Sequence, residues 1–332
     1  MHSLASGLVV ETSLTGGIPR TMRYASLIRK HEKGLISEDE LFEKAVEITA
    51  RTFSRLSRDL PDYVTDGMYL CDDILNPFIK DLVGVEVGGL VRFFENNFFV
   101  RQPIVRERIG LTETPARLLR RIELGERLRR LLRRKLRLPV PGPATFADLA
   151  LIEPSAPYNS RADLAMDYFA RILAPMLELA SGRDVILEVH DPSLTRLSKL
   201  DGGVLDAYKQ ALGTLSEREQ EKLHLIVYFG SFPRKLAAEA PKRVTLGLDL
   251  VESREDIELA RELRGRVQLG IIDARSTLME KIDALRRLVE ELSGPESVIL
   301  STNTTLEFLP ESVAYKKLRL LGRLKRGLES AR

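Results

Sequence analysis

Five short apolar runs in the second half of the chain end in polar or acidic residues, and charged segments separate them. The runs read VILEVHDP, HLIVYFG, RVTLGLDL, VQLGIID and SVILSTNT. Their aliphatic and β-branched residues lack clean alternation, which is typical of parallel strands buried on both faces. The segments between them, such as REDIELARELRG, repeat apolar residues at helical spacing. The pattern therefore predicts consecutive strand–helix units.

Three further strands are predicted upstream, at GLVVETS, DYVTDG and LPVPGPATF, which brings the total to eight. Amphipathic stretches lie between them. One begins at Ser37, a residue suited to the N-cap, with Glu40 placed to complete a capping box, and another runs from Asn159 to Leu179. Eight strands with helical crossovers predict an α/β fold, a (β/α)8 TIM barrel formed by the single domain 1–332. The active site of such a barrel lies at the C-terminal ends of its strands.

Two segments exceed a minimal barrel and place insertions at about 84–138, after the second strand. The first, Gly88 to Val105, has aromatic residues on both sides of Asn96 and Asn97, which predicts a β-hairpin arm with the Asn pair in its turn. The second, Pro115 to Leu138, is dense in arginine and has leucines at helical spacing. We interpret it as an amphipathic helix pair with a solvated basic face, in preference to a patch for anions or nucleic acid.

Composition narrows the class of protein. The 51 basic residues nearly balance the 48 acidic ones, so no general affinity for nucleic acid is expected. The one cysteine, Cys71, excludes an intramolecular disulfide, and no apolar stretch approaches the roughly 20 residues needed to cross a membrane. The first 19 residues lack the pattern of a signal peptide, which favours a cytoplasmic location. Charged residues make up 30% of the chain and tryptophan is absent, a composition associated with thermophiles.

Polar residues at the predicted strand ends should converge on one barrel mouth. A ring of carboxylates with one histidine and one arginine suits an amino acid, because Arg275 offers a planar fork to a carboxylate and the acids can bind an ammonium group. Two of these features also have a purely structural explanation. His190 can be satisfied by hydrogen bonds to its own neighbours, and GGIP can be a simple turn. The candidate catalytic residues are His190, Asp191, Asp249 and Asp273; the candidate substrate-binding residues are Gly16, Gly17, Asp66, Tyr228, Arg275, Asn303 and Thr304.

A series of motifs carries a family resemblance across most of the chain: TGGIPRT, KGLISEDEL, VTDG, GPATF, EVHDPSL, GIIDARST, and TNTTLEFLP followed by AYKKLRLL. Their order and spacing resemble a single barrel, of the archaeal type, of the cobalamin-independent methionine synthase family, which is similar in fold to uroporphyrinogen decarboxylase. The resemblance implies methyl transfer to the sulfur of homocysteine, with zinc activating the thiolate. Longer members of that family contain two barrels, and only the C-terminal one holds zinc.

The chain departs from the zinc ligands that the resemblance implies, which are one His, two Cys and a carboxylate. The His and first Cys positions read Val227 and Phe229, and the second Cys position reads Thr304, while Asp249 keeps the carboxylate. Because loss of thiolate greatly weakens such a zinc site, no metal and no other cofactor is predicted.

The substrate positions implied by the family depart as well. Its serine corresponds to Gly17 and its acid to Gly67, and its acidic pair is represented by His190 and Asp191. Asp273 matches.

Three functional hypotheses remain open at this point. The chain is a methyltransferase that activates the thiol through His190, Asp191 and Asp249, or it is a zinc-free barrel that binds the methyl donor or a separate zinc-bearing barrel. The third is a decarboxylase-like enzyme that acts on a small acid through Asp66 and Arg275. Homocysteine is the expected substrate in the first hypothesis, and a folate or a methylated corrinoid protein is the expected donor.

Overall fold

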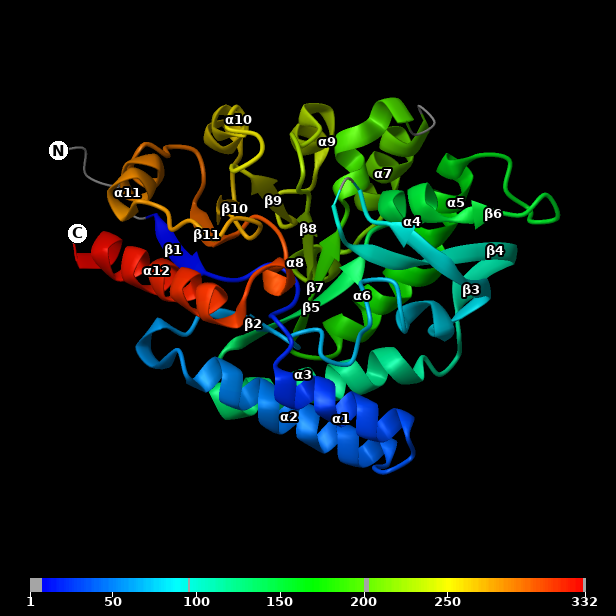
Figure 1. Ribbon diagram of the computed structural model, residues 1–332. Helices are drawn as coiled ribbons and strands as arrows, with labels where there is room; N and C mark the ends of the chain where they lie inside the picture. Colours follow the sequence, from blue (N-terminus) through cyan, green and yellow to red (C-terminus); the bar gives the residue numbers. More distant parts are fainter. Residues whose placement is uncertain (1–7, 95, 200–202, 331–332) are drawn as a thin grey trace.

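The computed structural model describes residues 8–94, 96–199 and 203–330. Its main sheet has eight parallel strands in the order β1, β11, β10, β9, β8, β7, β5, β2 and curves into a barrel surrounded by helices (Figure 1). This confirms the predicted TIM-barrel class. The barrel strands are β1 (Val9–Thr12), β2 (Tyr63–Thr65), β5 (Lys135–Pro141), β7 (Val185–His190), β8 (Leu223–Ile226), β9 (Thr245–Asp249), β10 (Arg266–Ile272) and β11 (Ser297–Thr302).

Helices cover the outside of the barrel. The α-helices are α1 (Met22–Glu32), α2 (Glu38–Ser54), α3 (Ala116–Leu132), α4 (Pro143–Leu149), α5 (Arg161–Tyr168), α6 (Ala174–Ser181), α7 (Gly203–Gly213), α8 (Glu217–Glu221), α9 (Arg234–Glu239), α10 (Asp256–Glu262), α11 (Ile282–Glu290) and α12 (Glu311–Ser330). Short 3-10 turns span Ser57–Asp59, Phe78–Asp81, Pro192–Lys199 and Leu306–Phe308, and a π-helical segment, Phe169–Leu173, joins α5 to α6. None of the described helices is long and apolar enough to span a membrane.

Asp62 connects the two strands at the ends of the sheet, β1 and β2. Its Oδ2 accepts hydrogen bonds from the Thr12 backbone N–H and hydroxyl, at 2.8 and 3.0 Å. Lys325 of α12 binds the same carboxylate with its Nζ at 2.8 Å. Partial burial alone would raise the pKa of Asp62. The ion pair with Lys325 and the hydrogen bonds from Lys325 and Thr12 outweigh this effect and lower the pKa of Asp62 overall. The C-terminal helix therefore helps to join the edges of the barrel.

The predicted arm is present as a long antiparallel hairpin, β3 (Leu82–Arg92) and β4 (Phe99–Leu111), with Asn96 and Asn97 between the strands. It extends beyond the expected Gly88 to Val105. The short strand β6 (Leu151–Ile152) adds to β4 in parallel, and the resulting three-stranded sheet lies beside α4 (Figure 1).

The arginine-rich segment corrects one expectation, because it forms the single helix α3 and not a helix pair. Leu118, Ile122 and Leu128 are buried, and a Cβ at Gly125 would overlap the side chain of Leu136 in β5, so α3 packs tightly against the barrel. It leads directly into β5 and is thus the crossover helix to the third barrel strand. Its arginines pair with acids of neighbouring elements, for example Arg127 with Glu43 of α2, at 2.5 Å.

A second correction concerns LPVPGPATF, which we expected to be a strand. The strand β5 begins earlier, at Lys135, and ends at Pro141, and the PATF residues begin α4. Pro143 favours this start, because its fixed φ and missing N–H suit the first helical position. The predicted N-cap is confirmed: the Ser37 hydroxyl accepts a hydrogen bond from the backbone N–H of Glu40, at 3.1 Å.

The interior of the barrel is polar, in contrast to the branched apolar residues that usually fill such barrels. Arg137, Glu188, His224 and Gln268 are each no more than 1% exposed. Contacts among interior groups cross between strands that are not neighbours: Arg137 of β5 donates to Ser13, just after β1, at 2.7 Å. The apolar core therefore lies mainly between the sheet and its helices.

We predict that the buried ion pair between Arg121 of α3 and Asp66, which directly follows β2, is needed for stability. Arg121 Nε lies 2.7 Å from Asp66 Oδ2, and the two side chains are 4% and 1% exposed. Replacing Arg121 by Met should lower the free energy of unfolding by about 3–5 kcal/mol, because Asp66 is left as an uncompensated buried charge. Urea denaturation measures the change. The exposed Arg130→Met on the same helix should change it by less than about 0.5 kcal/mol, and equal effects would contradict the prediction.

Candidate active site

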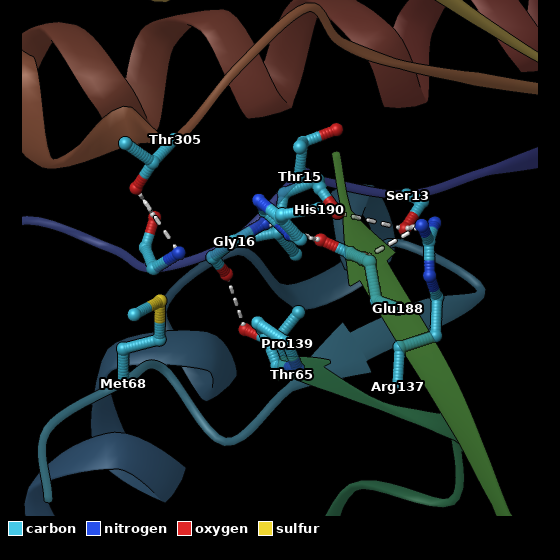
Figure 2. Close-up of polar contacts among 12 residues, drawn as sticks. Ser13, Thr15, Gly16, Thr65, Met68, Arg137, Pro139, Glu188, His190 and Thr305 are labelled. Carbon is cyan, nitrogen blue, oxygen red and sulfur yellow. Dashed lines mark hydrogen bonds and ion pairs between the residues drawn. The ribbon is translucent and has the colours of Figure 1, made fainter. Parts of the chain in front are cut away.

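A buried network of ionisable groups lies at the C-terminal end of β7 (Figure 2). His190 Nε2 is 2.6 Å from Glu188 Oε1, and the Arg137 guanidinium is 2.6 Å from Glu188 Oε2. His190 Nδ1 is 3.2 Å from the hydroxyl of Tyr228 at the end of β8. The structure thus brings together two predicted residues, His190 and Tyr228, with Glu188 and Arg137, which sequence reasoning missed.

The Glu188 carboxylate is ionised despite its complete burial. Burial acts to raise the pKa of Glu188, but the Arg137 guanidinium, His190 and the Gly16 backbone N–H outweigh it and lower the pKa overall. The Gly16 N–H donates to Glu188 Oε1 at 2.6 Å. A charged residue inside the apolar run VILEVH was the signal in the sequence that could have identified Glu188.

The GGIP turn closes the network from the side of β1. Gly16 has a φ of +67°, and a Cβ there would lie 3.2 Å from His190 Cε1 and 3.1 Å from Thr305 Cβ. At Gly17 a Cβ would lie only 2.7 Å from Glu307 Oε2. Both glycines therefore lie at the site, and their lack of side chains lets the backbone approach His190 and Glu307 closely.

Asp191 supports the fold instead of facing the barrel mouth. Its carboxylate accepts the backbone N–H groups of Ala144 and Thr145, at 3.1 and 2.6 Å, and the hydroxyl of Tyr208. Burial raises the pKa of Asp191 to about 6, against these hydrogen bonds, which lower it. Asp191 thus holds the first turn of α4, and its catalytic role stays a prediction without geometric support.

Asp249 is similarly occupied by loop backbone. Its Oδ1 accepts the N–H groups of Val251 and Glu252, each at 3.0 Å, and its Oδ2 accepts the N–H of Phe229 at 3.0 Å. The Asn303 side chain donates to the same Oδ2 at 3.3 Å. Burial raises the pKa of Asp249 to about 6. The carboxylate therefore organises the loops after β8 and β9.

A cleft of about 640 Å³ opens at the barrel mouth, between the tip of the arm and the loops after β10 and β11. It contains two predicted residues, Asp273 and Arg275, and its full lining is Asn96, Asn97, Phe98, Asp273, Arg275, Ser276, Glu307 and Phe308. Asp273 Oδ1 accepts the backbone N–H groups of Arg275 and Ser276, at 2.8 and 3.1 Å. Arg275 pairs with Glu252 and donates to Asn96 Oδ1 at 3.1 Å.

Of the remaining predicted residues, Asp66 is bound to Arg121 and Thr304 is buried. Asn303 bridges two loops, because its Oδ1 accepts the N–H of Ala274 at 2.9 Å while its amide contacts Asp249. Glu307, which sequence reasoning missed, lines the cleft, and burial raises the pKa of this carboxyl to about 7.

Aromatic side chains of the arm cover the mouth. The rings of Phe93 and Phe94 lie 6.3 and 5.4 Å from that of Phe229, centroid to centroid, and Phe98 lies 5.3 Å from Phe308. Phe229 has a φ of +70°, a conformation uncommon for residues other than glycine. The arm thus packs on Phe229, one of the positions where the resemblance to the methionine synthase family would place a zinc ligand.

The side chains at these positions do not fit zinc. Val227 and Phe229 have no donor atom, Thr304 has only a hydroxyl, and Asp249 is engaged by three backbone N–H groups. Zinc in such sites is bound by thiolate, imidazole and carboxylate. Among the residues the structure describes, no cluster of three or more His, Cys, Asp or Glu side chains is arranged to hold a metal ion.

Comparison with known proteins agrees with the resemblance seen in the motifs. No family model matches the chain. The methionine synthases of Sulfurisphaera tokodaii and Sulfolobus acidocaldarius are each 22% identical to it, over 93% of this chain and over 90% and 89% of their own lengths. The chain is thus similar, over nearly all of its length, to proteins named methionine synthase.

Solved structures agree in fold. The B12-independent methionine synthase from Shewanella sp. W3-18-1, in complex with selenomethionine, has a TM-score of 0.74 at 16% identity and covers 98% of this chain and 100% of its own. The putative vitamin-B12 independent methionine synthase from Listeria monocytogenes has a TM-score of 0.64, also at 16% identity, over 97% of this chain and 99% of its own. The predicted barrel is therefore shared along the whole length.

We predict that Glu307 makes stability depend on pH near neutrality. An unfolded Glu titrates near about 4.3, and the folded value is about 7. Because the folded state binds this proton more tightly, stability should fall as pH rises between these values. Glu307→Gln cannot ionise, so its Tm should fall less over this window than that of the wild type, measured by calorimetry. Asp191 and Asp249 retain part of the slope. The exposed Glu113→Gln serves as the control, and identical slopes for Glu307→Gln and wild type would contradict the prediction.

Proposed function

We propose that this chain is a methionine-synthase-type methyltransferase that transfers a methyl group to the sulfur of homocysteine and activates the thiol with side chains of its own. The observation that carries the proposal is His190, with Nε2 2.6 Å from the Glu188 carboxylate and Nδ1 3.2 Å from the Tyr228 hydroxyl. A base that is oriented by a carboxylate is a recurring means of activating a weak nucleophile. A free thiol needs such help, since its pKa of about 8.5 leaves little thiolate at neutral pH.

The cleft at the mouth supports an amino-acid substrate. Asp273 offers a carboxylate to an ammonium group, Glu307 offers a second one when it is ionised, and Arg275 offers a guanidinium to a carboxylate. Homocysteine carries both groups. A folate with an anionic tail and a methylated corrinoid protein are the two candidate methyl donors.

A second candidate function is that of a zinc-free barrel that works with a separate zinc-bearing barrel. The specific observation in its favour is the cover of the mouth: Phe93 and Phe94 pack on Phe229, and His190 and Tyr228 are each 3% exposed. In this alternative the partner would activate the thiol. The decarboxylase-like hypothesis stays a prediction: Asp66, one of its two residues, is buried in an ion pair with Arg121 and does not line the cleft that contains Arg275.

We predict that the purified chain catalyses methyl transfer to homocysteine without stoichiometric zinc. Metal analysis should find less than about 0.1 zinc per chain, since the ligand positions lack sulfur and imidazole donors, and a chelator should leave the rate unchanged. His190→Gln should lower kcat by about 100-fold or more, the usual contribution of a general base, while His31→Gln on the outer helix α1 should not.

The assay uses methyltetrahydrofolate and methylcobalamin as alternative donors, with methionine measured as the product. Stoichiometric zinc together with loss of activity on chelation would contradict the proposal. Activity that arises only when a zinc-bearing methionine synthase barrel is added would establish the second candidate function instead.

A further inference from the structure

We propose that Glu188 and Arg137 are positioning residues that hold His190 in its Nε2–H tautomer, so that Tyr228 and His190 form a relay that accepts the thiol proton of homocysteine. The inference rests on the proposed function, since it specifies how that site would remove the proton. The hydrogen-bond donors and acceptors of the buried network determine where its protons lie, and Figure 2 shows Arg137, Glu188 and His190 of that network.

The neighbours of Glu188 keep its carboxylate charged. An arginine side chain is always protonated in proteins. The Arg137 guanidinium lies 2.6 Å from Glu188 Oε2, and both side chains are fully buried. The Gly16 N–H donates to Oε1 at 2.6 Å. An ionised carboxylate only accepts hydrogen bonds. The contact of 2.6 Å between Oε1 and His190 Nε2 therefore requires the proton to be on Nε2.

The other ring nitrogen of His190, Nδ1, is left as a hydrogen-bond acceptor. In neutral His190 with a proton on Nε2, Nδ1 carries a lone pair and can only accept. The group at Nδ1 is the Tyr228 hydroxyl, 3.2 Å away, with the two rings at 79° to each other. The hydroxyl must therefore donate to Nδ1. Every hydrogen bond in the series then points the same way, from Tyr228 to His190 to Glu188.

The imidazole ring of His190 is held in place from several sides. Ser13 fixes Arg137 from the side of β1, at 2.7 Å from the guanidinium. Gly16 packs so closely on the imidazole that a Cβ there would lie 3.2 Å from His190 Cε1. Groups from the β1, β5 and β7 segments thus hold the ring, and rotation of the imidazole would break the hydrogen bond to Glu188.

The relay balances as a group transfer. The S–H bond of homocysteine breaks and its proton moves to Tyr228 Oη, as the Tyr228 proton moves to His190 Nδ1; the imidazolium is stabilised by Glu188. The sulfur lone pair then forms the S–CH₃ bond, and the donor leaves with the electron pair of its bond to the methyl group. The proton returns from His190 through Tyr228 to the donor's leaving atom or to water. Asp191 and Glu307 are the other acids that act electrostatically on Tyr228, and both disfavour its phenolate.

The tautomer can be measured independently of activity. In ¹⁵N-labelled protein at neutral pH, the His190 ring signals, assigned by their loss in His190→Gln, should show the proton on Nε2. Glu188→Gln removes the charge that sets this preference and should populate the Nδ1–H form. A wild-type spectrum with the proton on Nδ1, or with protons on both ring nitrogens, would overturn the inference, whether or not Glu188→Gln folds.

The relay is tested with a matched pair of hydroxyl deletions. Tyr228→Phe should lower kcat for methyl transfer by at least about 10- to 100-fold and leave KM for homocysteine nearly unchanged, because the ring remains in place. Tyr168→Phe is the control: Tyr168 is equally buried, but its hydroxyl donates to the backbone oxygen of Pro141, at 2.9 Å. The control should keep the wild-type kcat.

The outcomes separate the relay from the proposed function. A wild-type rate in Tyr228→Phe, or equal losses in both variants, would overturn the relay while methyl transfer by the wild type still supports the proposed function. Absence of methyl transfer by the wild type would overturn the proposed function and the relay with it, even with the proton on Nε2.

Discussion

The ion pair between Arg137 and Glu188 in the barrel interior is the interaction on which the candidate site depends. Both side chains are fully buried and 2.6 Å apart. A buried pair adds little net stability, because desolvation offsets the attraction, but removal of one partner leaves a costly unpaired charge. The pair is better understood as a positional constraint: it connects β5 to β7 and fixes the carboxylate against which His190 and the Gly16 backbone are placed.

A polar interior changes where the barrel obtains its stability. A typical barrel is filled with branched apolar side chains. The interior of this barrel contains Arg137, Glu188, His224 and Gln268 instead, and all four are buried. The apolar surface is instead buried between the sheet and the covering helices, as at Gly125 of α3, where the helix backbone approaches Leu136 closely. Some interior groups satisfy one another, as where the Gln268 amide donates to Thr15 at 3.0 Å. Among the described residues, both ring nitrogens of His224 and Oε1 of Gln268 have no hydrogen-bond partner, so the polar interior costs stability where such partners are missing.

The strands and the arm could be predicted because hydrophobic periodicity is local information, whereas the roles of the acids could not. Asp191 and Asp249 lie at strand ends, as expected, but their carboxylates are engaged by backbone N–H groups of α4 and of neighbouring loops, and only the folded chain shows where those groups point. Glu188 was missed for the opposite reason, since it lies inside an apolar run and not at its end. For α3, density of arginine suggested an added basic segment, yet its buried leucines make it a barrel helix.

The same loop geometry shows that more than side-chain identity opposes zinc at the positions where the resemblance would place its ligands. Asp249 keeps the carboxylate of the resembling family, but its Oδ2 holds the backbone N–H of Phe229 at 3.0 Å. That hydrogen bond, with the packing of Phe94 on the Phe229 ring, holds Phe229 at a φ of +70°. A sulfur donor placed at this position would still face a carboxylate already engaged by three backbone groups and a mouth covered by the arm. Zinc binding at these positions would therefore require the loop after β8 and the arm to rearrange together.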